Sequence, residues 1–457
     1  MKKAVLLIML VSLTCAVGAF AKVTLPAAKE LKLNNGMAVS VIERHQLPLF
    51  SVKVIFRAGS SSDPAGKEGL ASLTSDMLMR GTPTRTAKQI ADEVAFGGGD
   101  LNSTCDYVSA GLDGEFLSSQ GEKAFEIIAD LVRNSTFAPD EFDKTRTRTL
   151  GDLKSRLENP TNVATDAIWS NLLGKSRYAH FTGGDLASVK ALTRDDISAF
   201  AKKHFTPDNC LLVVCGDISA ADVQKWADKY FGAWSGKAAL EPEETAFAPV
   251  TGRQVIVYDK KDASQTQIRL GLSGIPLNHP DFAELEVART IYGGAFGSRL
   301  VNEIRVNRGL TYNVAYRSSN LKPGGVAYVT TFTKNATVGQ VIDLIFSVAN
   351  RMQTEAVPDT ERTHFTNYRC GTYPLSFETN DNLADVVAGM WLNKLDKSYY
   401  EDYQERLKAI TSKQAMDAAS KYFPKDNYCL VLVGKADDIM EQVKKYGPVT
   451  VLPFSTE

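Results

Sequence analysis

Apolar residues recur along the chain with two different periods, which predict the segments that form strands and those that form helices. Alternating or continuous apolar positions predict strands over Ser51–Ala58 and Gln267–Ile275. Apolar residues three and four positions apart predict helices over Ala87–Ala95, Glu122–Asn134 and Val341–Met352. Because the strands are grouped with long helices and do not alternate strictly with them, the pattern favours an α+β fold.

One stretch of this pattern occurs twice. Residues 191–216 are typical of a helix, a Pro/Asp/Asn turn and a buried strand, and a similar series recurs 218 positions later, at 409–434. A repeat of this length is far longer than a solenoid unit, so it predicts two similar α+β domains related by internal duplication. We place the first domain at residues 22–235 and the second at 250–457. Residues 236–249 interrupt all periodicity and are interpreted as a linker.

The first 21 residues have the pattern of a targeting segment. Lys2 and Lys3 precede an apolar run, and the segment ends in Ala19-Phe20-Ala21, the small-x-small pattern of a signal peptidase site. We therefore expect residues 1–21 to be a cleaved signal peptide and the protein to be exported, with the periplasm favoured and secretion left open. No later stretch approaches the ~20 uninterrupted apolar residues that cross a bilayer, so we expect no membrane span after cleavage.

Composition narrows the range of partners and chemistries. The 457 residues include 52 Lys and Arg against 53 Asp and Glu, which gives no electrostatic reason to expect a nucleic-acid partner. The five cysteines after the predicted signal peptide are irregularly spaced and form no C-x-x-C pair, so we expect neither a disulfide framework nor a cysteine-based zinc or redox site. Cys210 and Cys215 lie five positions apart in one apolar run and should face opposite sides of a strand.

Two groups of motifs carry a family resemblance. Gly69–Thr82 reads G-L-A-S-L-T-S-D-M-L-M-R-G-T and precedes a Gly-rich turn that ends at Asn102. Together they resemble the first domain of the pitrilysin/insulinase-type (M16) metallopeptidases, whose zinc helix reads G-L-A-H-x-x-E-H-M-x-x-x-G-T before a G-G-x-x-N turn. The resemblance continues at Gly293–Leu300 and Arg305-x-x-x-Gly309-Leu310-Thr311-Tyr312. It covers essentially the whole mature chain and implies two similar domains that form half of a clamshell chamber.

The sequence departs from this family at the metal-binding positions. The family uses two His four apart on one helix face to bind zinc and a Glu between them to activate water. Here Ser72 and Asp76 occupy the two His positions and Ser75 the Glu position, while Asp152 corresponds to the third ligand, a Glu in the family. Hydroxyls are poor ligands, and two carboxylates without imidazole suit a weak oxygen-loving cation better than zinc. We therefore expect a degenerate site without zinc, in which Leu70, Leu73, Met77 and Leu78 still give the helix a core-facing stripe.

A second pair of family residues is retained. In active members, an Arg and a Tyr seven positions apart in the second domain reach across the chamber towards the zinc of the first, and Arg305 and Tyr312 match them. A guanidinium and a phenol are strong donors to peptide carbonyl oxygens, and a phenol can stabilise a developing oxyanion. From residue types alone, Arg305 would be a solvated charge at a helix end and Tyr312 a packed strand residue.

The resemblance thus implies a chain that keeps the substrate-binding pair and lacks the metal. Some family members work as heterodimers in which one subunit carries the zinc helix and its partner carries substrate-binding residues. We therefore expect a non-catalytic, substrate-binding subunit that is inactive alone and supplies Arg305 and Tyr312 to a composite site. Its partner would be an M16-type subunit with an intact H-x-x-E-H motif and zinc, and its substrate a peptide. The alternative is a stand-alone peptide-binding or scaffold protein with no peptidase partner.

Overall fold

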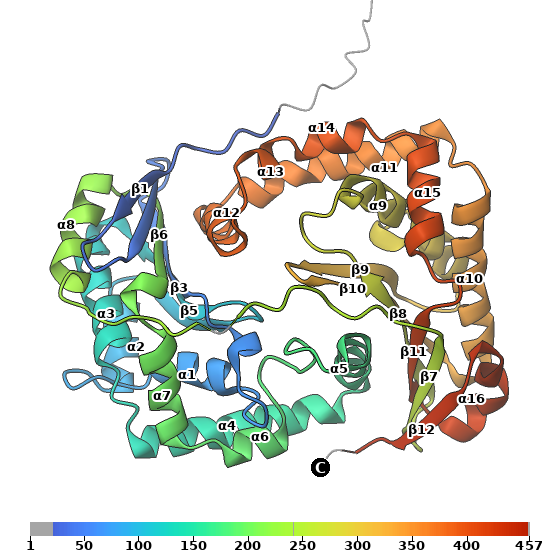
Figure 1. The fold of residues 1–457 in the computed structure, drawn as a ribbon, viewed down its shortest axis with the longest axis horizontal. Helices are drawn as coiled ribbons and strands as arrows, with labels where there is room; N and C mark the ends of the chain where they lie inside the picture. Colours follow the sequence, from blue (N-terminus) through green and yellow to red (C-terminus); the bar gives the residue numbers. More distant parts are fainter. Residues whose placement is uncertain (1–21, 241, 456–457) are drawn as a thin grey trace, which may run out of the picture.

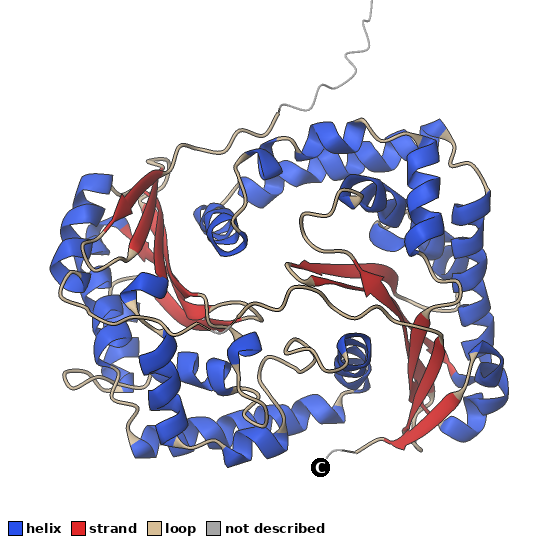
Figure 2. Cartoon of the chain, in the orientation of Figure 1, coloured by secondary structure: helices blue, strands red, loops and turns tan. Residues whose placement is uncertain are grey.

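The computed structural model describes residues 22–240 and 242–455, so the predicted signal peptide, residues 1–21, lies outside the described residues. Two six-stranded mixed sheets organise the chain, one in each half (Figures 1 and 2). The first sheet has the order β1 (Lys29–Lys32), β2 (Ala38–Glu43), β6 (Cys210–Gly216), β3 (Leu49–Phe56), β5 (Ala110–Leu117), β4 (Asp100–Cys105). The second has the order β12 (Val449–Pro453), β7 (Arg253–Asp259), β11 (Tyr428–Gly434), β8 (Gln265–Gly274), β10 (Gly324–Lys334), β9 (Val314–Leu321).

Helices flank both sheets, and each half has its own set. The first half contains α1 (Leu70–Leu78), α2 (Ala87–Phe96), α3 (Gly121–Asn134), α4 (Pro139–Glu158), α5 (Pro160–Leu173), α6 (Leu186–Ala191), α7 (Arg194–His204) and α8 (Ala220–Phe231). The second contains α9 (Phe282–Arg289), α10 (Val338–Thr354), α11 (Asp359–Thr372), α12 (Asn380–Asn393), α13 (Ser398–Glu401), α14 (Tyr403–Lys408), α15 (Ser412–Tyr422) and α16 (Ala436–Val443). The predicted α+β class with two similar domains is confirmed, whereas the predicted domain boundaries stay a prediction.

The sequence repeat reappears as matching structure. Both α7 and α15 begin after a threonine, Thr193 or Thr411, whose hydroxyl accepts a hydrogen bond from the backbone amide three residues later in a capping box. Each helix leads to a central strand, β6 or β11, that is buried along its whole length. Such strands need apolar residues on both faces, which explains their continuous apolar runs. Cys210 and Cys215 pack into different cores on the two sides of β6, as predicted.

Each sheet is covered on one face by helices of its own half and on the other by a helix of the opposite half. The α12 helix packs against β6 and β3 of the first sheet, and α5 packs against β11 and β8 of the second (Figure 1). In both cases a basic side chain of a central strand meets the incoming helix. Lys53 of β3 lies 2.8 Å from a carboxylate oxygen of Asp381 and of Asp385 on α12. Arg269 of β8 donates to the carbonyl of Thr161 on α5 at 3.2 Å. The two halves are therefore interlocked.

No helix of the described residues is both long enough and apolar enough to span a membrane.

Candidate functional site

The α1 helix, which carries the degenerate zinc motif, is held from its first turn. Gly69 precedes it with φ of +94°, and a Cβ there would lie 2.6 Å from the Gly183 carbonyl oxygen, so the close approach requires glycine. The Asp63 carboxylate accepts hydrogen bonds from the backbone amides of Gly69 at 2.7 Å and Ala71 at 2.8 Å. Burial raises the pKa of Asp63 to about 7, although these amides favour the charged form.

The predicted apolar stripe of α1 faces the core of the first half. Leu70, Leu73, Met77 and Leu78 are all buried there. The helix thus keeps its place through packing of its apolar face and needs no metal for that purpose.

Ser75, at the position of the family's general base, has a structural role. Its side chain is buried and its hydroxyl lies 2.9 Å from the Thr104 carbonyl oxygen of β4 and 2.8 Å from the Gly111 carbonyl oxygen of β5. The hydroxyl therefore attaches α1 to the sheet at these two carbonyls, either of which it can donate to.

Asp76, at the second His position, is engaged on both carboxylate oxygens. One oxygen accepts from the Ser103 hydroxyl at 2.5 Å, and the other from the Arg148 guanidinium of α4 at 3.2 Å. Burial and the charge of Arg148 lower the pKa of Arg80, and the charge of Asp76 opposes this shift. The Arg148 guanidinium thus occupies the carboxylate at this former metal position, and its positive charge opposes the binding of a metal cation.

Asp152, at the third ligand position, is exposed on α4. Among the described residues, no hydrogen bond or ion pair joins it to Ser72, Ser75 or Asp76. Arg148, one turn earlier on the same helix face, is the residue that reaches Asp76 instead. Within residues 22–240 and 242–455, no three His, Cys, Asp or Glu side chains come together in a way that could hold a metal ion. The donors at these positions do not fit zinc.

Arg305 and Tyr312 flank the short turn that leads into β9 in the second half. Arg305 belongs to a π-helical segment, Val301–Val306, and its guanidinium lies 5.0 Å above the ring of Phe296. The Phe296 and Tyr312 side chains are 74% and 83% exposed. The interpretation of Tyr312 as a packed strand residue is therefore wrong, because Tyr312 precedes β9 and projects into solvent.

The two sets of predicted residues lie in opposite halves of the chain. Ser72, Ser75 and Asp76 lie on α1, which is in the left half of Figure 1, whereas Arg305 and Tyr312 come between α9 and β9 in the sequence, in the second half of the chain. Sequence reasoning missed Arg148 and Phe296. Arg148 could have been found from its place one turn before Asp152, and Phe296 from its isolation among glycines.

Comparisons with known protein families match most of the chain. Residues 39–184 match the model described as insulinase (peptidase family M16), and residues 191–363 match the model described as the peptidase M16 inactive domain.

Individual relatives point the same way. An uncharacterized zinc protease of Rickettsia bellii is 28% identical over 65% of this chain and 71% of its own length. An uncharacterized zinc protease of Bacillus subtilis is 23% identical over 90% of this chain and 99% of its own. A Pseudomonas fluorescens crystal structure, described as a peptidase M16 inactive domain, superposes with a TM-score of 0.83 at 26% identity over 89% of this chain and 98% of that one.

Proposed function

Because the chain belongs to the M16 peptidase family, we propose that it is the non-catalytic, substrate-binding subunit of a two-subunit zinc peptidase. The match to the inactive-domain model supports a non-catalytic member of the family. In this proposal the chain forms half of the peptidase chamber, and the partner has an intact H-x-x-E-H motif and supplies the zinc. The predicted signal peptide supports export to the periplasm.

One contrast carries the proposal. The side chains at the former base and metal-ligand positions contact this chain's own groups: Ser75 bonds to the sheet and Asp76 pairs with Arg148. The side chains at the substrate-binding positions are instead turned outward, because Tyr312 projects into solvent and Arg305 lies over the exposed Phe296 ring. The exposed phenol of Tyr312 and the half-buried guanidinium of Arg305 can donate hydrogen bonds to the carbonyl oxygens of a bound peptide.

The roles of the two residues follow from these donors. The Arg305 guanidinium would bind and orient a peptide carbonyl through its N–H donors. The Phe296 ring covers one face of this guanidinium, so a peptide would approach it from elsewhere. The Tyr312 hydroxyl would donate to a carbonyl oxygen at the cleavage point, where negative charge develops during hydrolysis. The partner's metal would supply the activated water.

Activity assays with and without the partner test this proposal. The mature chain alone should cleave no peptide, and the mixture with a zinc-bearing M16 subunit should. In the mixture, Arg305→Ala or Tyr312→Phe should lower kcat/KM by ~10–1,000-fold, the range for loss of a transition-state donor.

Matched controls separate this role from general effects on folding. Arg308→Ala removes a neighbouring guanidinium that pairs with Glu303, and Tyr368→Phe removes another partly exposed phenol, so both should leave turnover unchanged. Chelator-sensitive cleavage by the chain alone would contradict the proposal. Peptide binding without any stimulation of a zinc-bearing subunit would favour the stand-alone binding protein instead.

A further inference from the structure

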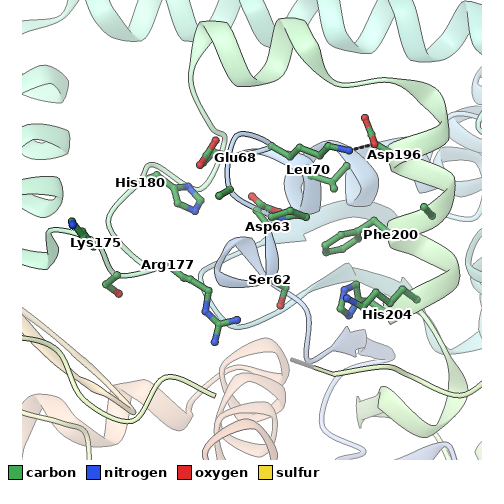
Figure 3. Close-up of a pocket in the computed structure, with 16 residues that line it drawn as sticks. Ser62, Asp63, Glu68, Leu70, Lys175, Arg177, His180, Asp196, Phe200 and His204 are labelled. Carbon is green, nitrogen blue, oxygen red and sulfur yellow. Dashed lines mark hydrogen bonds and ion pairs between the residues drawn. The ribbon is translucent and has the colours of Figure 1, made fainter. Parts of the chain in front are cut away.

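A cavity of about 560 Å³ lies at the N-terminal end of α1, away from the degenerate zinc positions. Three segments line it: the loop that precedes α1 with the start of that helix, the loop that follows α5, and one face of α7 (Figure 3). Its volume falls within the range of small-molecule sites, about 300–1,000 Å³. The backbone amides of Gly69 and Ala71 at the start of α1 are already taken by Asp63, so the cavity has to be judged by its side chains.

One part of the lining is apolar. Pro64 and Ala199 are exposed and line the cavity together with Leu70 and Phe200, which are almost fully buried. Such a surface gains free energy when it covers an apolar group of a ligand, at roughly 25 cal/mol per Å² removed from water. An inorganic anion has no apolar group that could cover this part of the cavity.

More basic than acidic side chains line the cavity. Asp196 forms an ion pair with Lys67, and Asp63 holds two backbone amides. Burial places the pKa of Asp63 near 7, so part of this carboxyl is neutral at neutral pH. Lys175, Arg177 and Lys203 add three positive charges to the lining, and Glu68 adds one negative charge. The cavity therefore carries a positive excess.

The Arg177 and Glu68 side chains lie on opposite sides of the cavity. Figure 3 shows Arg177 and His204 on the side opposite Glu68, with Asp63 between them. His180 donates from Nδ1 to the Phe181 carbonyl oxygen at 2.9 Å, which leaves its other ring nitrogen as an acceptor in the neutral form. A single carboxylate fits the Arg177 side, whereas a second negative charge on the same ligand would approach Glu68. This arrangement selects against polyanions.

We propose that this cavity binds an organic monocarboxylate with an apolar body. The carboxylate pairs with Arg177 and the adjacent basic side chains, and the apolar body lies against Pro64 and Ala199, next to the buried Phe200 and Leu70 side chains. A free small acid and the C-terminal end of a peptide share this chemistry. The inference does not depend on the proposed function, because none of its residues belongs to the Arg305/Tyr312 surface.

Calorimetric titration of the full mature chain with N-acetyl-L-phenylalanine tests the proposal. We expect saturable binding, with about tenfold or greater weakening when the ligand's carboxylate is replaced by an amide. Arg177→Gln should weaken binding to a similar extent, and Lys202→Gln, on α7 but outside the cavity, should not. Arg177 also donates to the Pro242 carbonyl oxygen of the linker, so Ala199→Phe, which narrows the cavity without touching a charge, provides a second variant.

Peptide ligands distinguish the two sources of the carboxylate. Binding of an acetylated tripeptide that ends in phenylalanine, together with loss of binding when its C-terminus is amidated, would assign the site to peptide ends. Binding of the amino-acid derivative alone would assign it to free small acids. The proposal is overturned if the wild-type chain shows no saturable binding up to about 10 mM. It is equally overturned if the amide binds as tightly as the acid, if both cavity variants bind normally, or if inorganic phosphate competes as well as the carboxylate.

Discussion

A refitted zinc motif tests whether Arg148, in addition to the missing histidines, keeps a metal ion out of this chain. Ser72→His, Asp76→His and Asp152→Glu restore the three ligands of the family, and Ser75→Glu restores the base. We compare the refitted chain with and without Arg148→Gln. Ser75 is buried, so its replacement by Glu could destabilise the variant that carries all four substitutions. Because Ser75 supplies no metal ligand, the variant with only the three ligand substitutions also serves as the metal-binding test.

The geometry around Asp76 sets the size of the expected effect. The Arg148 Nη2 atom lies 3.2 Å from the Asp76 Oδ2 atom, and the two side chains are 49% and 31% exposed. A zinc ion bound to residue 76 at about 2 Å would lie about 5 Å from the guanidinium. In a water-like dielectric, which suits this exposure, the repulsion between the divalent ion and Arg148 is about 1.7 kcal/mol. This energy corresponds to about twentyfold in zinc affinity.

Zinc affinity is measured by competition with a chromophoric chelator, and bound metal by elemental analysis after dialysis. We expect Arg148→Gln to tighten zinc binding to the refitted chain by about twentyfold. Arg146→Gln is the matched control, because Arg146 lies on the same helix but pairs with Asp143. Equal zinc affinity with and without Arg148→Gln would refute the electrostatic reasoning, and an equal gain from Arg146→Gln would assign the effect to net charge.

Two further predictions concern stability. Lys53→Met leaves Asp381 and Asp385 of α12 without their shared cation, so the free energy of unfolding at pH 7 should fall by about 1–3 kcal/mol, and added Asp385→Asn should restore part of it. Lys29→Met, which removes an exposed ion pair with Glu43, should lower the unfolding free energy by less than about 1 kcal/mol. Both variants are measured by urea titration, and equal losses of unfolding free energy would argue that Lys53 does not hold the two halves together. The raised pKa of Asp63 makes the folded state bind a proton more tightly than the unfolded state, so its contribution is complete below about pH 4 and is lost as the pH rises to about 7. Asp63 contributes at most about 1.4 kcal/mol per pH unit to the change of the unfolding free energy with pH, and Asp63→Asn should remove this contribution. If the unfolding free energies of the wild type and Asp63→Asn change in parallel with pH, the change cannot be assigned to Asp63.

Much of the fold was readable from local patterns. The threonine caps at Thr193 and Thr411 and the continuous apolar strands after them are local features, and both copies appear in the structure at the predicted spacing. The exchange of α5 and α12 between the halves was not predicted. An apolar helix face can be buried against either sheet. The periodicity of a helix therefore shows that its face is buried, but it does not show which sheet covers that face.

The sequence identified the residues of the candidate site, but it did not predict which residues contact one another there. Alignment with a motif located Ser72, Ser75 and Asp76, and the missing imidazoles were visible at once. That Arg148 occupies the carboxylate of Asp76 depends on how α1 and α4 cross, which no sequence spacing reports. Likewise the exposure of Tyr312 depends on where β9 begins, and element ends are the least predictable feature of a sequence.

The contacts of α1 explain why the helix keeps its position although its zinc ligands are absent. In the family pattern the ligands come from the segments that correspond to α1 and α4, so a bound ion would also cross-link these two helices. Here the ion pair of Asp76 with Arg148 joins the same two helices, and the Ser103 hydroxyl joins Asp76 to β4. An ion pair at this exposure contributes modestly, about 0–1 kcal/mol, so most of the stability of α1 comes from its buried stripe, Asp63 and Ser75. Natural substitution could therefore remove the metal without unfolding the chamber wall, provided that the residues replacing its ligands found partners inside the same chain.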